Sequence, residues 1–172
     1  SGSSGIEFPK QIEWYFNLLS EVGRMCTTAS VYEGAENWPN LYAGAFSVML
    51  LILFVLNKRI NWKKKIAPVL FVLFFMASFA NKQLDFIWHG LHFPDSLPGR
   101  QSYLYAFLVL TIGYATVRKW RGIRLWHVGV AVVFASALMA VSTMFAGEDV
   151  TEYYAVIISI LFVALYGIMT VL

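Results

Sequence analysis

Five blocks of apolar residues are the feature that most limits how this chain can fold. The blocks lie at about residues 40–56, 66–80, 102–117, 125–145 and 153–172. An α-helix needs about 20 residues to cross the hydrocarbon core of a bilayer, so the shorter blocks would borrow flanking residues. Charged residues make up only 13% of the chain, against about 25% in an average soluble domain. We therefore predict an all-α, polytopic membrane protein with about five transmembrane helices.

The basic residues are concentrated in two of the segments that join these blocks. Residues 57–65 contain five lysines and arginines, residues 118–124 contain four, and neither segment contains an acid. On the other side of the predicted bundle, residues 81–101 carry two charges of each sign and residues 146–152 carry only acids. Short basic loops stay on the cytoplasmic side of a membrane. Residues 1–40 and 81–101 are therefore predicted to be extracytoplasmic.

The same distribution of charge excludes nucleic acid as a partner. The net charge is +3, but the lysines and arginines lie at the ends of apolar blocks instead of along one soluble face. The single cysteine, Cys26, cannot form an intrachain disulfide. Most tryptophans and tyrosines also lie near block ends, as expected for an aromatic belt at the membrane interfaces. Membrane lipid is thus the partner that composition predicts.

Residues 1–40 are more polar and are predicted to form an outer region, separate from the transmembrane bundle of residues 40–172. Apolar side chains recur here at near-helical spacing, and a glycine follows as a stop: Phe8, Ile12, Tyr15, Phe16, Leu19 and Gly23. This spacing predicts an amphipathic helix that lies at the membrane interface or packs on the spans. Residues 1–5 do not resemble a signal peptide, and the last block runs to the final residue. We expect the chain to be an internal piece of a longer polypeptide.

An unusually polar stretch, DFIWHGLHFPDSLPGRQSY, follows the second block at residues 85–103. If its first part is helical, Asp85, Trp88, His89 and His92 share one face. Two imidazoles and a carboxylate suit a divalent metal such as zinc or manganese. The alternatives are interfacial histidines that bond to the backbone or to a neighbouring span, and histidines that contact a polar substrate. The residues alone leave all three hypotheses open.

The second part of this stretch places an arginine close to the start of a helix. Pro94 and Pro98 prevent a helix from running through it, so the next helix begins near Arg100. A cation there opposes the helix dipole unless an anion is shared between the guanidinium and the free backbone N–H groups. At a membrane interface that anion would be the phosphate of a lipid-linked substrate. Alternatively, Arg100 reaches lipid headgroups or pairs with Asp95.

Three motifs occur in order across the first part of the chain. They are Pro-Asn-x-Tyr-x-Gly at residues 39–44, Trp-His-Gly-x-x-x-Pro at 88–94 and the Leu-Pro-x-Arg-x-Ser/Tyr entry into the next apolar block at 97–103. In this order and at these distances they resemble the YfhO family of bacterial membrane proteins, over most of residues 30–120. The resemblance implies a multi-pass protein of the bacterial cell membrane.

The resemblance also implies a function in the cell envelope. Members of the family look like glycosyltransferases of the GT-C class, which take a sugar from a polyprenyl-phosphate donor on the outer face of the membrane. The acceptor would be a cell-envelope polymer such as lipoteichoic acid. The catalytic base of the family is an acid in an early outer loop, and we expect that loop to lie in the remainder of the parent polypeptide. The present chain alone is then expected to be inactive, and no cofactor is implied.

Under this interpretation the polar stretch supplies contacts to the sugar donor. Arg100 would bind the phosphate, and His89 and His92 would hydrogen-bond the phosphate or the sugar. Asp95 would orient Arg100 or contact a sugar hydroxyl. Trp88 would stack on the sugar ring or anchor the chain at the interface.

Two other classes of protein stay open on the sequence. A transporter or lipid-flipping protein would use the polar stretch to line a path. None of the five blocks has a charged residue at its centre, however, which transporters that handle ions usually need. A non-catalytic, structural membrane fragment would use the stretch only to pack on a partner.

Overall fold

The computed structural model describes residues 11–27, 38–92, 99–145 and 152–172. These residues form six α-helices and two short 3-10 helices, and no β-strand occurs among them. The elements in chain order are η1 (Ser20–Met25), α1 (Ala45–Leu56), α2 (Trp62–Ala80), α3 (Lys82–Trp88), α4 (Ser102–Arg118), η2 (Trp120–Gly122), α5 (Leu125–Phe145) and α6 (Tyr153–Met169). The predicted all-α fold is confirmed.

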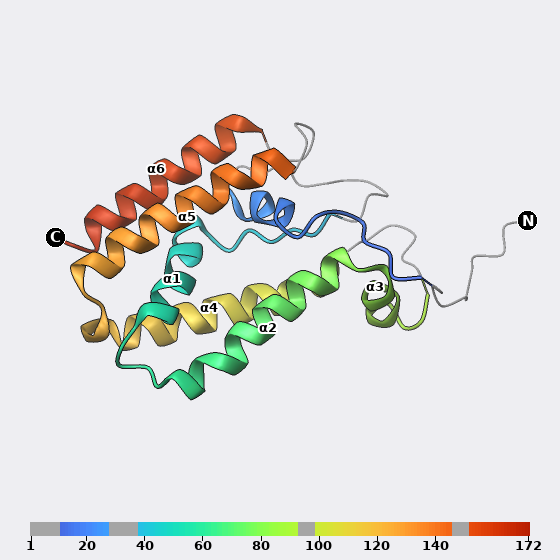
Figure 1. Cartoon of the computed structure of the whole chain (residues 1–172), viewed down its shortest axis with the longest axis horizontal. Helices are drawn as coiled ribbons and strands as arrows, with labels where there is room; N and C mark the ends of the chain where they lie inside the picture. Colours follow the sequence, from blue (N-terminus) through green and yellow to red (C-terminus); the bar gives the residue numbers. More distant parts are fainter. Residues whose placement is uncertain (1–10, 28–37, 93–98, 146–151) are drawn as a thin grey trace, which may run out of the picture.

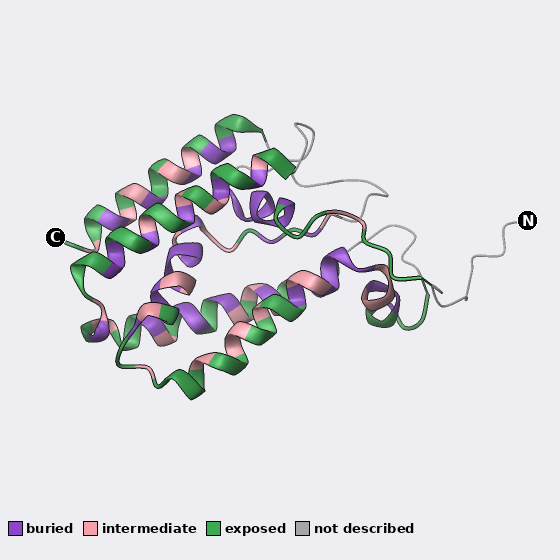
Figure 2. Cartoon of the chain, viewed as in Figure 1, coloured by how far each residue is buried: buried purple, intermediate pink, exposed green. Residues whose placement is uncertain are grey.

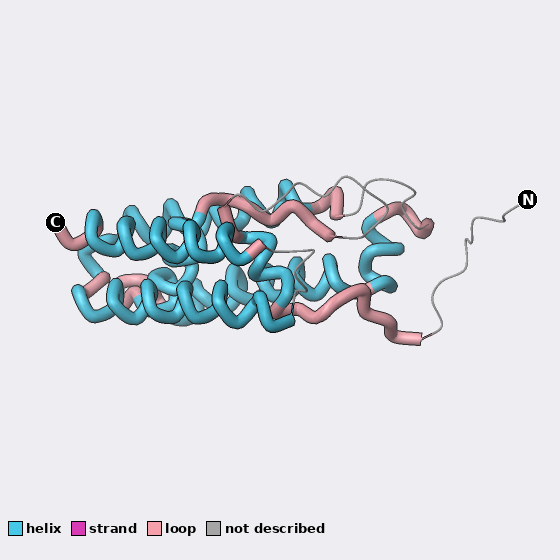
Figure 3. Tube along the Cα trace, turned by 90° about the horizontal axis from the view of Figure 1, so that it is seen from above, coloured by secondary structure: helices cyan, strands magenta, loops and turns pink. Residues whose placement is uncertain are grey.

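The four longest helices run lengthwise through the molecule in two layers (Figure 1). α5 and α6 lie side by side in one layer, α2 and α4 form the other, and α1 lies between the layers. Figure 3 shows from above that these helices make up most of the described chain. α1 contacts α4, α5 and α6, and its Met49 and Leu53 are completely buried. α1 is therefore the central helix of the bundle.

Large apolar side chains cover the outer faces of the long helices. Leu70 of α2, Phe107 of α4, Val133 of α5 and Leu161 of α6 are all more than half exposed. Exposed and buried residues alternate along α4, α5 and α6, whereas the buried residues of α2 lie near its C-terminal end (Figure 2). α5 has 21 residues and is long and apolar enough to cross a bilayer, while α1 and α6 are shorter apolar helices. The number of membrane crossings stays a prediction.

The predicted amphipathic helix near the N-terminus is wrong for the residues that the structure describes. Residues 11–19 are not helical, and the short helix η1 begins only after them. Instead, the Tyr15 N–H donates to the Ala80 oxygen at 2.8 Å, and the Lys82 N–H donates to the Glu13 oxygen at 3.1 Å. Backbone groups that pair with another segment are no longer available to a helix. Pairing between distant segments therefore overrides the helical spacing of the apolar side chains.

Local features of the chain explain where α1 and α2 begin. α1 starts at Ala45, because Gly44 has a φ of 92° that lies outside the helical region. α2 starts at Trp62, so the basic residues that follow it belong to the helix. Asn61 caps α2, since its side-chain oxygen accepts a hydrogen bond from the Lys63 N–H at 3.0 Å.

The two basic segments lie together at one end of the bundle. Asn57 is completely buried between them, where its Nδ2 donates to the Lys119 oxygen at 3.0 Å and its Oδ1 accepts from the Arg59 N–H at 2.9 Å. The Lys58 N–H also donates to the Gly122 oxygen at 3.4 Å. A Cβ on Gly122 would lie 2.9 Å from the Arg59 side chain and would overlap that of Asn57. The joint between the two segments is therefore closely packed.

We expect Asn57→Ala to lower the free energy of unfolding by about 1–3 kcal/mol, because it removes two hydrogen bonds that hold this joint together. Thermal unfolding of the protein in detergent micelles measures the change. Lys58→Ala removes an exposed side chain from the same segment and is the control. Equal unfolding midpoints for the Asn57→Ala variant and the control would contradict a structural role for the joint.

Candidate functional site

The polar stretch begins in α3, which follows α2 after a single residue. That residue, Asn81, caps α3, because its Oδ1 accepts a hydrogen bond from the Leu84 N–H at 3.0 Å. α3 ends at Trp88, since Gly90 and Leu91 have φ angles of 72° and 65°. The helix therefore carries only the first few residues of the polar stretch.

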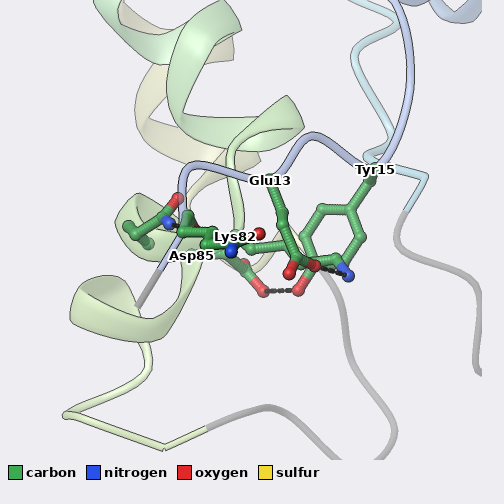
Figure 4. Close-up of polar contacts among 6 residues, drawn as sticks. Glu13, Tyr15, Lys82 and Asp85 are labelled. Atoms are coloured by element: carbon green, nitrogen blue, oxygen red, sulfur yellow. Dashed lines mark hydrogen bonds and ion pairs between the residues drawn. The ribbon is translucent and has the colours of Figure 1, made fainter. Parts of the chain in front are cut away.

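Asp85 and His89 form a buried pair on α3, and Tyr15 from the N-terminal segment joins them. Asp85 Oδ1 lies 3.2 Å from His89 Nδ1, and Asp85 Oδ2 accepts a hydrogen bond from the Tyr15 hydroxyl at 3.2 Å. His89 Nδ1 also lies 2.9 Å from the Asp85 backbone oxygen. Figure 4 shows Tyr15 directed at Asp85. These contacts fix the imidazole, whose buried Nε2 has no hydrogen-bond partner in the described part of the chain.

The protonation of this cluster is set by burial and by its own contacts. Burial raises the pKa of the Asp85 carboxyl, while His89 and the Tyr15 hydroxyl offset part of that rise. Burial and the neighbouring Asp85 charge raise the pKa of Tyr15, so its hydroxyl stays a proton donor at neutral pH. The charge of Asp85 thus depends on its two partners.

Residues 11–15 form an N-terminal strap across α3. Lys82 Nζ lies 2.6 Å from Glu13 Oε2 (Figure 4), and the Gln83 side chain donates to the Gln11 backbone oxygen. Both members of the Lys82–Glu13 pair are partly exposed, so this ion pair contributes little to stability. The strap is held mainly by its backbone hydrogen bonds and by the contact of Tyr15 with α3.

The structure brings together only part of the site that the sequence predicted. His89 is buried beside Asp85, whereas Trp88 is 39% exposed and stacks on Phe75 of α2 with 5.9 Å between ring centroids. His92 is exposed and follows the end of α3. These residues do not form the helical metal-binding face that their spacing suggested. Within the described ranges, no three histidine, cysteine or acidic side chains lie close enough to hold a metal ion.

Arg100 lies two residues before α4, and Gly99, which precedes it, packs closely on another segment of the chain. Gly99 has a φ of 63° and packs on Pro39, whose Cβ would lie 2.9 Å from a Cβ at this position. Two motifs that are far apart in the sequence therefore meet here. Arg100 is exposed and has no hydrogen-bond or ion-pair partner among the described residues, and no side chain caps α4. Asp95 lies outside the described residues, and so does its predicted pairing with Arg100.

Two buried ionisable residues of η1 were not predicted from the sequence. Arg24 donates from Nε to the Pro39 oxygen at 3.3 Å and from Nη2 to Asn40 Oδ1 at 2.9 Å, so it ties η1 to the Pro-Asn motif. Glu21 is 0% exposed, and its carboxylate oxygens have no hydrogen-bond partner among the residues described. Burial raises the pKa of Glu21 to about 9, which keeps this side chain protonated at neutral pH.

One sequence signal could have pointed to these two residues. Glu21 and Arg24 are the only charges in residues 14–31, and they lie three positions apart among apolar side chains. Tyr15 carried no such signal, because its partner Asp85 is 70 positions away in the sequence. Local spacing cannot reveal a contact over that separation.

A bundle of apolar helices with exposed apolar faces and basic segments at one end defines a helical membrane protein. The model of the family described as bacterial membrane protein YfhO matches residues 4–172. The chain therefore belongs to the YfhO family, as its motifs predicted. No curated protein and no solved structure matches the chain.

We expect Glu21→Gln to stabilise the protein at neutral and alkaline pH. The folded chain keeps Glu21 protonated up to about pH 9, whereas the unfolded chain ionises it near its ordinary pKa of 4.5. The stability of the unchanged protein therefore falls as the pH rises between these two values, and the glutamine variant lacks this fall. Thermal unfolding midpoints across this pH range measure the difference.

Glu13→Gln, which changes a half-exposed acid of the N-terminal strap, is the matched control. It should leave the pH dependence of the unfolding midpoint close to that of the unchanged protein. If Glu21→Gln and Glu13→Gln gave parallel curves, Glu21 would not be buried in its neutral form.

Proposed function

We propose that the chain is part of a membrane glycosyltransferase of the GT-C class. The enzyme takes a sugar from a polyprenyl-phosphate donor and transfers it to a cell-envelope polymer such as lipoteichoic acid, on the outer face of the bacterial membrane. The bond between the sugar carbon and the donor phosphate oxygen breaks, and an acceptor oxygen takes its place. The acceptor hydroxyl gives its proton to a base, and the lipid phosphate leaves with an additional negative charge.

The observation that carries this proposal is the position of Arg100. Its side chain is exposed and lacks a hydrogen-bond or ion-pair partner among the described residues. Arg100 lies two positions before α4, whose N-terminus has no side-chain cap. A guanidinium presents paired N–H donors that suit a phosphate, and the positive end of the α4 dipole adds to the attraction. Their attraction strengthens as the leaving phosphate gains charge, which is the condition for lowering the barrier. We therefore assign Arg100 to the donor phosphate.

His89 supports the same site as a hydrogen-bonding group. Asp85 holds His89 Nδ1 at 3.2 Å, and Nε2 lacks a partner within the described residues. An imidazole with one nitrogen oriented by a carboxylate presents the other nitrogen to a phosphate or to a sugar hydroxyl. Asp85 and Tyr15 act as positioning residues. Because Nε2 is buried, this contact requires a local movement that exposes it.

Trp88, His92 and Asp95 complete the proposed contacts to the donor. The exposed part of the Trp88 ring stacks on the sugar, and His92 bonds to the sugar or the phosphate. Asp95 orients Arg100 or contacts a sugar hydroxyl. We place the base in the remainder of the parent polypeptide, as the family resemblance implies.

This function requires the site to be extracytoplasmic. The five longer helices then cross the membrane, with residues 57–65 and 118–124 in the cytoplasm and residues 1–40 and 81–101 outside. Support for this arrangement comes from the packing of the two basic segments at one end of the bundle. Arg100 and α3 lie at the opposite ends of α4 and α2 from these segments.

The test is sugar transfer by the full parent protein carrying Arg100→Ala, with a polyprenyl-phosphate sugar as donor. We expect kcat/KM for the donor to fall about a hundredfold, the effect of removing a group that stabilises developing charge. Arg100→Lys should recover part of the loss, because it restores the charge without the paired donors. Arg121→Ala removes an exposed arginine at the other end of the bundle and is the control.

Two results would count against the proposal. Unchanged donor KM and turnover in the Arg100→Ala protein would remove Arg100 from the mechanism. A parent protein that transfers no sugar from any polyprenyl-phosphate donor would overturn the glycosyltransferase activity itself.

A further inference from the structure

A second site lies between α2 and α4, at the end of the bundle that carries the basic segments. The buried residues of α2 all fall in its last six positions, from Phe75 to Ala80, whereas α4 has buried residues along its whole length. The first half of α2 therefore leaves a gap beside α4. A cavity of about 490 Å³ occupies this position.

The mouth of this cavity is strongly basic. Four exposed residues that line it are Arg59, Lys64, Arg118 and Lys119, and the described lining contains no acid. They come from the loop between α1 and α2, from the first turn of α2 and from the end of α4. None of the four has an ion-pair partner in the described part of the chain. All four charges would attract an anion that binds at the mouth.

The rest of the lining is mainly apolar and lies deeper in the bundle. Leu108 and Ala115 precede Arg118 on α4, and Pro68 follows Lys64 on α2. Leu108 and Arg118 are ten positions apart, which corresponds to roughly 15 Å along a helix. The cavity therefore passes from a basic mouth to an apolar interior. An amphiphile with an anionic head matches both parts, whereas a free phosphate matches only the mouth.

The basic mouth is held in place before a ligand binds. Asn57 is hydrogen-bonded to the backbone of both Arg59 and Lys119, so these two residues keep fixed relative positions. Gly122 packs so closely on the Arg59 side chain that it leaves no space for a Cβ. A preformed arrangement of charges loses less entropy on binding than mobile surface lysines do.

We propose that this cavity binds one anionic phospholipid. The lipid phosphate lies among the four basic side chains of the mouth, and an acyl chain lies between α2 and α4. Basic pockets between helices of membrane proteins bind anionic headgroups through the same attraction. The site lies at the other end of α4 from Arg100, so it is independent of the proposed sugar transfer. It requires only the membrane location that belongs to the family.

The test is a titration of the purified full chain with lipid, followed by native mass spectrometry in a non-ionic detergent. The three probes are phosphatidylglycerol, phosphatidylcholine and glycerol 3-phosphate. We expect one phosphatidylglycerol to stay bound, phosphatidylcholine to bind more weakly, and glycerol 3-phosphate not to compete. The same order should appear in the thermal stabilisation that each probe gives.

Two double variants separate this site from general surface charge. Lys64→Gln with Arg118→Gln removes two charges from the mouth and should weaken phosphatidylglycerol binding about thirtyfold. Lys63→Gln with Arg124→Gln removes the same charge from neighbouring residues that do not line the cavity, and should change binding by less than about twofold. All four side chains are exposed, so neither variant disturbs the core.

Ala115→Trp tests the apolar part separately, because it fills the interior and keeps every charge. It should weaken phosphatidylglycerol binding by a similar factor.

Three outcomes would overturn the proposal. They are equal weakening in the two double variants, competition by glycerol 3-phosphate at the affinity of the lipid, and phosphatidylcholine binding as tight as that of phosphatidylglycerol.

Discussion

The packing of α1 among α4, α5 and α6 is the interaction on which the rest of the structure depends. α1 has only 12 residues, yet Met49 and Leu53 on it have no exposed surface. Gly113 of α4 permits this approach, since a Cβ there would lie 3.1 Å from the Leu50 side chain. Lipid supplies no hydrophobic force between helices, so close contact over small residues takes that role in a membrane protein. Because α1 packs between the layer of α5 and α6 and the layer of α2 and α4, it fixes how the two layers lie relative to each other.

Different contacts hold the segments together at the two ends of the bundle. At the basic end, the amide of Asn57 joins two loops that would otherwise repel each other. At the other end, the N-terminal strap crosses α3, and Gly99 packs on Pro39. α4 has 17 residues and spans roughly 25 Å between the two ends. The headgroup of a ligand at one end therefore does not contact the headgroup of a ligand at the other.

Hydropathy was sufficient to predict the helical fold and three short motifs to predict the family, because both depend on residues that are close in the sequence. The contacts of the candidate site were not predictable in this way. Tyr15 lies in a stretch with helical spacing, but its backbone pairs with Ala80 and its hydroxyl with Asp85. His92 was grouped with His89 on the assumption of a longer helix, which the positive φ of Leu91 ends. These contacts join segments that are far apart in the sequence, so they are determined by the packing of the whole bundle.

The N-terminal strap also bears on the order in which the chain acquires its structure during synthesis. Glu13 and Tyr15 leave the ribosome well before their backbone partners Ala80 and Lys82. At about 5–20 residues per second, the interval is roughly 3–13 s. During that time water or lipid headgroups must solvate the backbone groups of the strap. The strap closes only after α1 and α2 have been synthesised, so a closed Tyr15–Asp85 contact marks a chain that already contains both helices.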